Sequence, residues 1–207
     1  MLNRPAGPEV PRENRSASTD PLRKTPGMEA PTLRTDRLVL RPPLPSDVDE
    51  ITAACQDPEI QRWTVVPTPY RRTDAEYFVE RIGAAGWAGG TNCTWVVRTA
   101  EDGALVGAQG VALKADRPGT GEIGYWVAPG LRRLGYAYEA SRAVVDWSFA
   151  ELGLRRLEWV AYTGNEPSRA LADRLGFRFE GTLRSYAEQR GTFRDAWIAA
   201  LLADDPR

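Results

Sequence analysis

The feature that most constrains the fold is a six-residue turn at positions 132–137, Arg-Arg-Leu-Gly-Tyr-Ala. It joins an expected strand at residues 123–127 to an expected helix, and the N–H groups and dipole at a helix start favour a bound anion. Gly135 would let a phosphate approach the backbone closely, while Arg132 and Arg133 would add positive charge. The turn alone favours an ordinary glycine-containing helix start, so its neighbours must decide whether it is an anion site.

The pattern of elements around this turn predicts a mixed α/β fold. We expect strands near residues 38–40, 94–97, 104–113, 123–127, 157–162, 177–183 and 193–202, and helices near residues 46–55, 73–82, 136–151 and 167–175. The first two helices begin at capping-box-like pairs, Ser46 with Asp49 and Thr73 with Glu76. Residues 63–70, which contain two prolines, are expected to form a loop. This order is typical of one mixed sheet with covering helices.

Length and composition favour a single domain. A chain of 207 residues can bury one substantial core but is short for two domains. Residues 1–30 are rich in Pro, Arg, Glu, Ser and Gly, so we expect a disordered tail there and a domain over residues 31–207. The formal net charge of -1 argues against a general nucleic-acid binder. Without a membrane-spanning apolar stretch or a signal-peptide core, the protein is expected to be cytoplasmic.

The absence of histidine restricts the chemistry. A histidine base, a His-based triad and a His-ligated metal are all excluded, and no metal is expected. Cys55 and Cys93 have no partners at metal-ligand spacing and are expected to be buried small side chains. A proton acceptor must be a carboxylate, a tyrosine, a thiolate, one of the two lysines or water.

Two segments resemble the acetyl-CoA motif of the GNAT acetyltransferase superfamily. Residues 121–129, Gly-Glu-Ile-Gly-Tyr-Trp-Val-Ala-Pro, together with the turn at 132–137, are similar to its first half. Asn165 and Ser168, followed by Leu-Gly-Phe at residues 175–177, are similar to its second half. These neighbours favour the interpretation of the turn as a pyrophosphate site.

Two further motifs are similar to one branch of that superfamily. They are Thr-x-Arg-Leu-Val-Leu-Arg at residues 35–41 and Gly-x-Phe-x-Asp at residues 191–195. The branch includes the ribosomal-protein N-terminal acetyltransferases RimJ and RimL. In all, the resemblance covers about residues 32–203.

The resemblance implies a single-domain GNAT fold, with a mixed, mostly antiparallel sheet that is splayed at the cofactor site and flanked by helices. Acetyl-CoA, or another acyl-CoA, would donate its acyl group to an amine within a ternary complex. The pantetheine arm would lie between the strands at residues 124–127 and 157–162. The implied cofactor-binding residues are Trp126, Val127, Arg132, Arg133, Leu134, Gly135, Tyr136, Ala137 and Asn165. Among them, Trp126 and Val127 would donate backbone hydrogen bonds, also to the oxyanion.

The catalytic candidates are Glu122 and Ser168. In this branch a glutamate at the position of Glu122 is a favoured base, acting directly or through water. Otherwise Glu122 would be an exposed carboxylate or one paired with an arginine. Ser168 could donate a hydrogen bond to the departing sulfur, or else cap backbone N–H groups at its helix start. Many GNAT enzymes place a tyrosine acid on this helix, but the matching residue is Ala172.

Trp63 and Tyr70 are the candidates for the wall of the acceptor site, although tryptophans are more often core or loop anchors. The variable segments near residues 60–90 and 184–193 would set the acceptor. A protein N-terminus is the leading acceptor because of the RimJ/RimL resemblance. Lysine side chains and small amines remain alternative acceptors. A larger acyl group such as succinyl remains an alternative to acetyl, and the protein could form a homodimer. The alternative function is an acyl-CoA-binding module with little catalysis, because Ala172 leaves the acid undefined.

Overall fold

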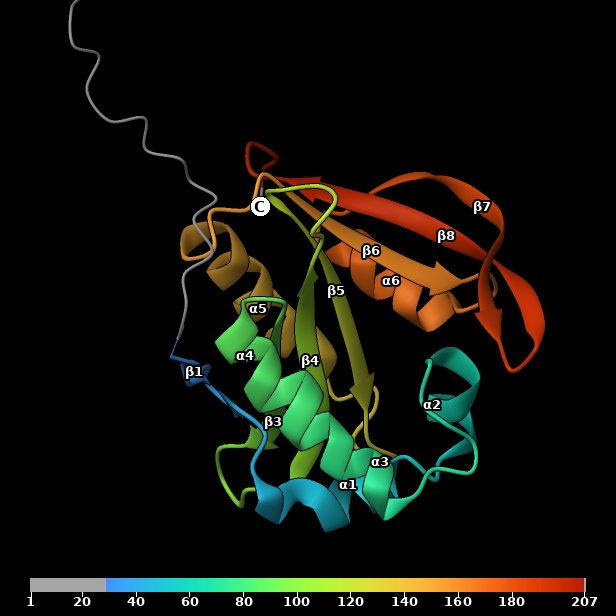
Figure 1. The fold of residues 1–207 in the computed structure, drawn as a ribbon. Helices are drawn as coiled ribbons and strands as arrows, with labels where there is room; N and C mark the ends of the chain where they lie inside the picture. The colour runs from blue at the N-terminus through green and yellow to red at the C-terminus, as the bar shows by residue number, and fades with distance from the viewer. Residues whose placement is uncertain (1–28, 207) are drawn as a thin grey trace, which may run out of the picture.

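The computed structural model describes residues 29–206, in which eight strands form one sheet with helices on both faces (Figure 1). The strands are β1 (Leu33–Arg34), β2 (Leu38–Arg41), β3 (Asn92–Thr99), β4 (Leu105–Leu113), β5 (Thr120–Val127), β6 (Arg156–Tyr162), β7 (Arg178–Gln189) and β8 (Thr192–Leu202). The helices are the 3-10 helix η1 (Pro45–Asp47), α1 (Val48–Ala54), α2 (Pro58–Trp63), α3 (Arg72–Tyr77), the π-helix η2 (Phe78–Ala84), α4 (Ala85–Gly89), α5 (Tyr136–Ala150) and α6 (Glu166–Arg174). The tail expected over residues 1–30 lies outside the described residues, except for its last two.

The strand order is β1-β2-β3-β4-β5-β6-β8-β7, and every neighbouring pair is antiparallel except β5 and β6. The expected mixed, mostly antiparallel sheet is confirmed. A parallel pair needs a crossover connection, which here is the turn and α5. The start of α5 therefore lies at the end of β5, in the middle of the sheet.

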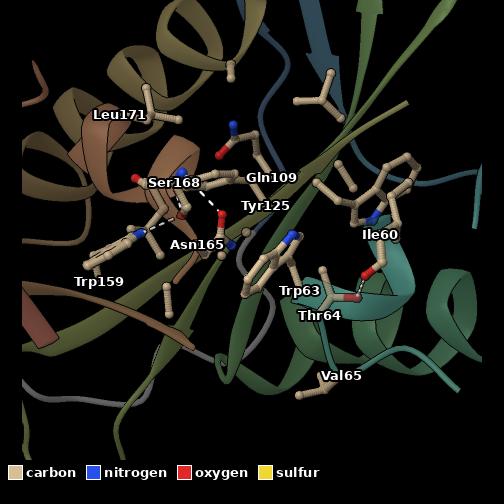
Figure 2. Close-up of a pocket in the computed structure, with 18 of the residues that line it drawn as sticks. Ile60, Trp63, Thr64, Val65, Gln109, Tyr125, Trp159, Asn165, Ser168 and Leu171 are labelled. Carbon is tan, nitrogen blue, oxygen red and sulfur yellow. Dashed lines mark hydrogen bonds between the residues drawn. The ribbon is translucent and has the colours of Figure 1, made fainter. Parts of the chain in front are cut away.

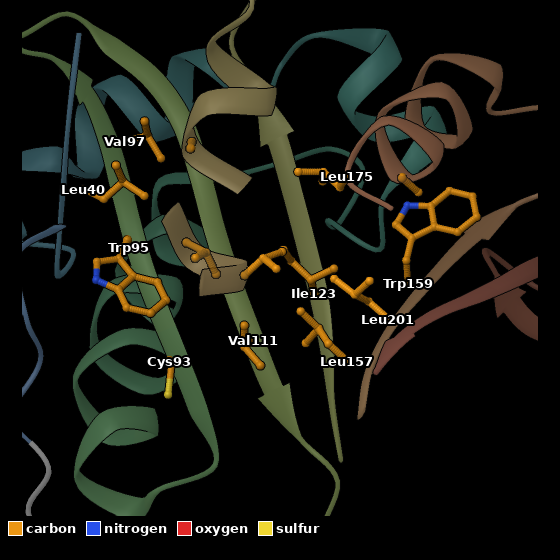
Figure 3. Packing of buried hydrophobic residues seen from close by; sticks show 14 of the residues in the cluster. Leu40, Cys93, Trp95, Val97, Val111, Ile123, Leu157, Trp159, Leu175 and Leu201 are labelled. Atoms are coloured by element: carbon orange, nitrogen blue, oxygen red, sulfur yellow. The ribbon is translucent and has the colours of Figure 1, made fainter. Parts of the chain in front are cut away.

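Two buried clusters fill the space between the sheet and its helices. The larger cluster includes Trp95 on β3 and Ile123 on β5, and it extends under α5 and α6 (Figure 3). The smaller one joins Ile51 of α1 to Val96 on the opposite face of β3. Because side chains alternate along a strand, the central strands contribute to both clusters and are fixed in register.

Arg41, the last residue of the Thr-x-Arg-Leu-Val-Leu-Arg motif, has a structural role. The carboxylate of Asp47 is fully buried and accepts hydrogen bonds from Arg41 at 2.7 and 2.8 Å and from Arg98 at 2.6 Å. Burial alone would raise the pKa of Asp47, but these hydrogen bonds and one from the Leu44 N–H hold it below its usual value. The network ties β2 and β3 to η1.

The helix α2 was not predicted. Its start carries two ordinary signals, because the Asp57 carboxylate accepts a hydrogen bond from the Ile60 N–H at 2.9 Å and Pro58 occupies the first turn. Trp63, which was expected in a loop, is the last residue of this helix. The six-residue helix is too short for its apolar periodicity to stand out.

The starts of the neighbouring helices also differ from the expected pairs. The carboxylates that accept hydrogen bonds at these starts are Asp47, bonded to the Leu44 N–H, and Asp74, bonded to the Arg71 N–H. The expected pairs at Ser46 and Thr73 are therefore each wrong by two residues. A competing acidic residue lies two positions before each expected one, and sequence alone did not rank them.

The hairpin of β7 and β8 is longer than expected and takes in most of residues 184–193. β7 continues through an irregularity between Leu183 and Ala187, where Ser185 has φ 48. The Asp195 carboxylate accepts a hydrogen bond from the Ser185 N–H at 2.8 Å. The Gly-x-Phe-x-Asp motif therefore supports a kinked strand instead of a free loop. Across residues 29–206, no helix has the length and apolar character needed to cross a membrane.

Candidate active site

The site is built on a divergence of β5 from β6. The two strands pair only from Thr120 opposite Arg156 to Ile123 opposite Trp159. Beyond this point β5 follows β4 as far as Val127 while β6 follows β8, so the strands separate (Figure 1). A cavity of about 1030 Å³ reaches from this gap toward both faces of the sheet. The splayed sheet predicted from the resemblance is confirmed.

The turn at residues 132–137 has the backbone shape of an anion site. Gly135, the residue before α5, has φ 85 in the left-handed region, and no side chain caps the N–H groups of the first helical turn. Arg133 also has a positive φ of 65, and its side chain is exposed. Uncapped N–H groups at the start of a 15-residue helix suit a phosphate. Arg133, Gly135 and Ala137 line the cavity.

The Thr-x-Arg portion of the early motif holds this turn from behind. The Glu139 carboxylate on α5 accepts hydrogen bonds from the Thr35 hydroxyl at 2.5 Å and from the Arg37 Nε at 2.7 Å. Arg37 also donates to the Leu134 carbonyl at 3.1 Å and lies over the Tyr136 ring at 4.7 Å. These contacts fix the first turn of α5 and leave its N–H groups open. Leu134 and Tyr136 thus contribute backbone and support, because neither side chain lines the cavity.

Arg132 connects the turn to α2. Its Nη2 forms an ion pair with Asp57 at 2.6 Å, and its Nε donates to the Val127 carbonyl at 3.1 Å. Burial alone would raise the pKa of Asp57, but the hydrogen bonds from Arg132 and the Ile60 N–H lower it on balance. Arg132 is thus engaged within the protein. Arg133, by contrast, forms no ion pair with another described residue, so its charge is available to a ligand.

The backbone of β5 presents groups to the gap. The Ala128 N–H donates to the Val106 carbonyl on β4 at 2.8 Å. Because backbone groups alternate in direction along a strand, the N–H groups of Tyr125 and Val127 point away from β4, while that of Trp126 points toward it. The Trp126 side chain lines the cavity. Of the two expected backbone donors, Val127 is therefore the one directed into the gap.

Ser168 lies on α6 at the cavity surface, with its hydroxyl held from two sides (Figure 2). The Trp159 Nε1 donates to Ser168 Oγ at 3.0 Å, and the Tyr125 hydroxyl lies 2.8 Å from the same oxygen. Burial raises the pKa of Tyr125, against hydrogen bonds from Ser168 and Trp159 that lower it, so the phenol keeps its proton. The Ser168 hydroxyl does not cap the helix, which was the alternative to a catalytic role.

The cap of α6 is Asn165. Its Oδ1 accepts a hydrogen bond from the Ser168 N–H at 3.3 Å, and Pro167 lies in the first turn. The same side chain lines the cavity, and its amide Nδ2 has no bond to another described residue. Asn165 can therefore cap the helix and donate to a ligand at once. Ala172, at the position of the absent tyrosine, is buried in the core.

Glu122 lies on β5 just before the strands separate, and it lines the cavity. Its carboxylate forms an ion pair with Lys114 of the loop after β4. Burial alone would lower the pKa of the Lys114 ammonium, but the hydrogen bond and charge of Glu122 raise it on balance. The expected alternatives were a base or an arginine-paired carboxylate, and the observed partner is a lysine.

Trp63 and Tyr70 line the same cavity on the side of α2 (Figure 2 shows Trp63). The Trp63 indole donates to Glu59 at 2.9 Å, and Tyr70 is buried against Cys55. Burial raises the pKa of Cys55 to about 11, against a hydrogen bond to Tyr70 that lowers it. Cys55 therefore stays a thiol at neutral pH, which makes it a poor nucleophile.

The turn between β7 and β8 packs against the end of α2. Gln189 donates to the backbone carbonyls of Arg62 at 3.1 Å and Thr64 at 2.8 Å, and Arg190 donates to that of Gln61 at 2.7 Å. The two segments expected to set the acceptor thus touch each other. Their contact was missed because side chain to backbone bonds leave no sequence pattern. Tyr125 was missed as a partner of Ser168 for the same reason, since strand alternation does not reveal what a side chain meets.

No cluster of carboxylates and thiols among residues 29–206 could hold a metal ion. The polar groups at the site include the Glu122 carboxylate, the hydroxyls of Ser168 and Tyr125 and the N–H groups of the β5 backbone, all of which can form hydrogen bonds.

Comparisons with known proteins agree with this geometry. Residues 37–178 match the family model described as an acetyltransferase (GNAT) domain. The chain is 31% identical to the uncharacterized N-acetyltransferase YoaA of Bacillus subtilis (strain 168) over 172 residues, which are 83% of this chain and 97% of YoaA.

Two solved structures are also similar. Mycobacterium smegmatis RimJ, in complex with CoA-disulfide, has a TM-score of 0.73 and 26% identity, over 81% of this chain and 82% of RimJ. RimL, a ribosomal L7/L12 alpha-N-protein acetyltransferase in complex with coenzyme A, has a TM-score of 0.75 and 17% identity, over 83% of this chain and 98% of RimL. The likeness to RimL shows the fold alone. Since the family model spans most of the chain and YoaA matches over nearly its whole length, this chain belongs to the GNAT acetyltransferases and is an acyltransferase.

Proposed function

We propose that the protein transfers the acetyl group of acetyl-CoA to a primary amine, with a protein or peptide N-terminus as the leading acceptor, by direct attack in a ternary complex. The observation that carries the proposal is the gap between β5 and β6, which opens beside an uncapped helix start. The RimJ and RimL structures that share this fold hold coenzyme A or its disulfide, which supports an acyl-CoA here.

The residues fit a CoA thioester in a definite order. The N–H groups at the start of α5, with Arg133, would hold the pyrophosphate, because free N–H groups and the helix dipole favour a bound phosphate there. The pantetheine arm would lie along the open edge of β5 and meet Asn165. The Val127 N–H, directed into the gap, would donate to the thioester oxygen as it gains negative charge. This arrangement leaves the α2 side of the cavity for the amine.

Two proton transfers accompany the reaction. The nitrogen lone pair of the amine attacks the carbonyl carbon, a C–N bond forms and the C–S bond breaks. Glu122 would take the amine proton, directly or through water, with its carboxylate positioned by Lys114. Ser168 would donate a proton or a hydrogen bond to the leaving sulfur. Tyr125, which keeps its own proton, can donate to Ser168 Oγ in turn.

The test mixes purified protein with acetyl-CoA or succinyl-CoA and three amines, while free thiol is followed. The amines are a peptide with a free N-terminus, an N-blocked peptide carrying lysine, and a small alkylamine. We expect thiol release that needs both acetyl-CoA and an amine and is fastest with the free N-terminus, and mass spectrometry should locate the acetyl group on the α-amine. Binding of acetyl-CoA without amine-dependent thiol release would contradict the proposal and favour an acyl-CoA-binding module.

A further inference from the structure

Tyr162 lines the cavity, and its hydroxyl is buried without a hydrogen-bond partner among the described residues. Tyr162 is the last residue of β6, is 6% exposed and lines the cavity. A buried hydroxyl that has given up its bonds to water is costly to leave unpaired. The proton chemistry proposed above does not use it. A ligand that supplies the missing bond would account for it.

Tyr162 points toward the amine side of the gap. Along β6, Trp159 and Ala161 pack into the cluster under α6, and Trp159 meets Ser168 there. Because side chains alternate along a strand, Tyr162 lies on the opposite face. Trp63 of α2 lies near that face. The Arg194 guanidinium lies over the rings of both residues, at 4.7 Å from the Tyr162 ring and 5.6 Å from the Trp63 ring.

The charge beside Tyr162 is positive. Arg194 donates to the Gln189 side-chain oxygen at 2.7 Å and to the Arg62 carbonyl at 3.4 Å, both of which are neutral. No carboxylate forms an ion pair with Arg194 within residues 29–206. A cation over the face of a phenol draws electron density from the ring, which favours the hydroxyl as a donor. The partner that fits is an oxygen atom with negative or partly negative charge, and an ammonium group fits poorly.

We infer that the Tyr162 hydroxyl donates a hydrogen bond to an oxygen of the amine substrate and so selects amines that carry a carbonyl or carboxylate on the adjacent carbon. Amino acids and peptide N-termini have this chemistry, and a lysine side chain does not. The inference rests on the proposed acyl transfer to an amine and narrows its substrate class. Tyr162 acts in selection of the substrate, while the bond-making step stays with the groups at β5 and α6.

The test uses the single change Tyr162→Phe, which keeps the ring and its contact with Arg194 and removes only the hydroxyl. Alaninamide and isopropylamine serve as the substrates, because they differ chiefly in the carbonyl next to the amine carbon. We expect the KM for alaninamide to rise about fivefold to tenfold in the variant, because one neutral hydrogen bond is lost. The kcat should stay nearly unchanged. The KM values for isopropylamine and acetyl-CoA should not change.

Tyr77→Phe is the matched control, because Tyr77 is 60% exposed on α3 and does not line the cavity. It should leave both amines unaffected. The melting temperature of Tyr162→Phe is a second readout. An unpartnered hydroxyl predicts equal or higher stability, and a drop of several degrees would overturn the inference by revealing an internal partner.

Two kinetic outcomes would also overturn it. One is an unchanged KM for alaninamide in Tyr162→Phe. The other is an equal fall in kcat for both amines, which would mean that the hydroxyl acts on the acyl donor. Failure of the proposed function is distinguishable, because it would appear in the wild-type protein as an absence of turnover with every amine.

Discussion

At the scale of single residues, the proposed proton transfer to the leaving sulfur depends on how Ser168 is held. The Trp159 indole can only donate, so it occupies an acceptor site on Ser168 Oγ. Tyr125 is buried and stays protonated, and either hydroxyl of the Tyr125–Ser168 pair can donate. When Tyr125 donates, the Ser168 proton is free to point into the cavity. A relay from Tyr125 through Ser168 would supply a proton where Ala172 replaces the tyrosine of many GNAT enzymes.

We predict that Ser168→Ala lowers kcat about 100-fold, the usual effect of removing a general acid, and changes the KM for acetyl-CoA little. Steady-state kinetics with the preferred amine would measure this. Ser148→Ala is the control, because Ser148 is also a buried helical serine but donates to the Val144 carbonyl at 2.7 Å, away from the cavity. A Ser168→Ala enzyme with a kcat within twofold of wild type would show that solvent protonates the sulfur.

At the scale of elements, the start of α5 depends on the left-handed backbone of Gly135. An alanine at φ 85 is strained by about 1–2 kcal/mol, and its Cβ would lie 3.2 Å from the Arg37 guanidinium that supports the turn. The strain would shift the N–H groups that are proposed to bind the pyrophosphate. The other end of α5 offers a comparison, since Gly153 has φ 60 and open space around it.

Gly135→Ala is therefore expected to weaken the binding of CoA about tenfold, as measured by titration calorimetry, while the protein stays folded. Gly153→Ala carries similar strain far from the cavity, so it should lower the melting temperature and leave the affinity for CoA unchanged. Equal loss of affinity in both variants would mean that general destabilisation is the cause. Unchanged affinity in Gly135→Ala would count against the turn as the pyrophosphate site.

The elements that sequence reasoning predicted well are those with local signals. β5, the turn and α5 combine a strand, a positive-φ glycine and helical periodicity within about 30 residues. The short helix α2 and the kinked hairpin of β7 and β8 were misjudged, because their positions depend on distant partners. Gln189 bonds to the end of α2, and Asp195 bonds to Ser185. Such contacts override local preference and leave no periodic pattern.

The candidate site shows the same division. The cavity brings together the expected Glu122, Asn165, Ser168 and Trp63, which are spread over much of the chain. The sequence could name these residues through motifs, but it could not say that Arg132 would be engaged by Asp57. Nor could it show that Tyr162 would be buried without a partner.

At the scale of the whole molecule, three connections between distant parts of the chain join the elements around the cavity. Arg132 joins the turn before α5 to Asp57 at the start of α2. The β7 and β8 hairpin joins the end of α2 through Gln189. Arg37 joins the first strands to α5. The elements on either side of the divergent strands are thus tied together by contacts within the protein.

The central claim is that the gap between β5 and β6 holds an acyl-CoA, and a crystal structure with acetyl-CoA tests it most directly. The account predicts the pyrophosphate at the N–H groups that begin α5, the pantetheine arm between β5 and β6, and the thioester oxygen within hydrogen-bond distance of the Val127 N–H. Acetyl-CoA bound elsewhere, with the gap between β5 and β6 left empty, would contradict it.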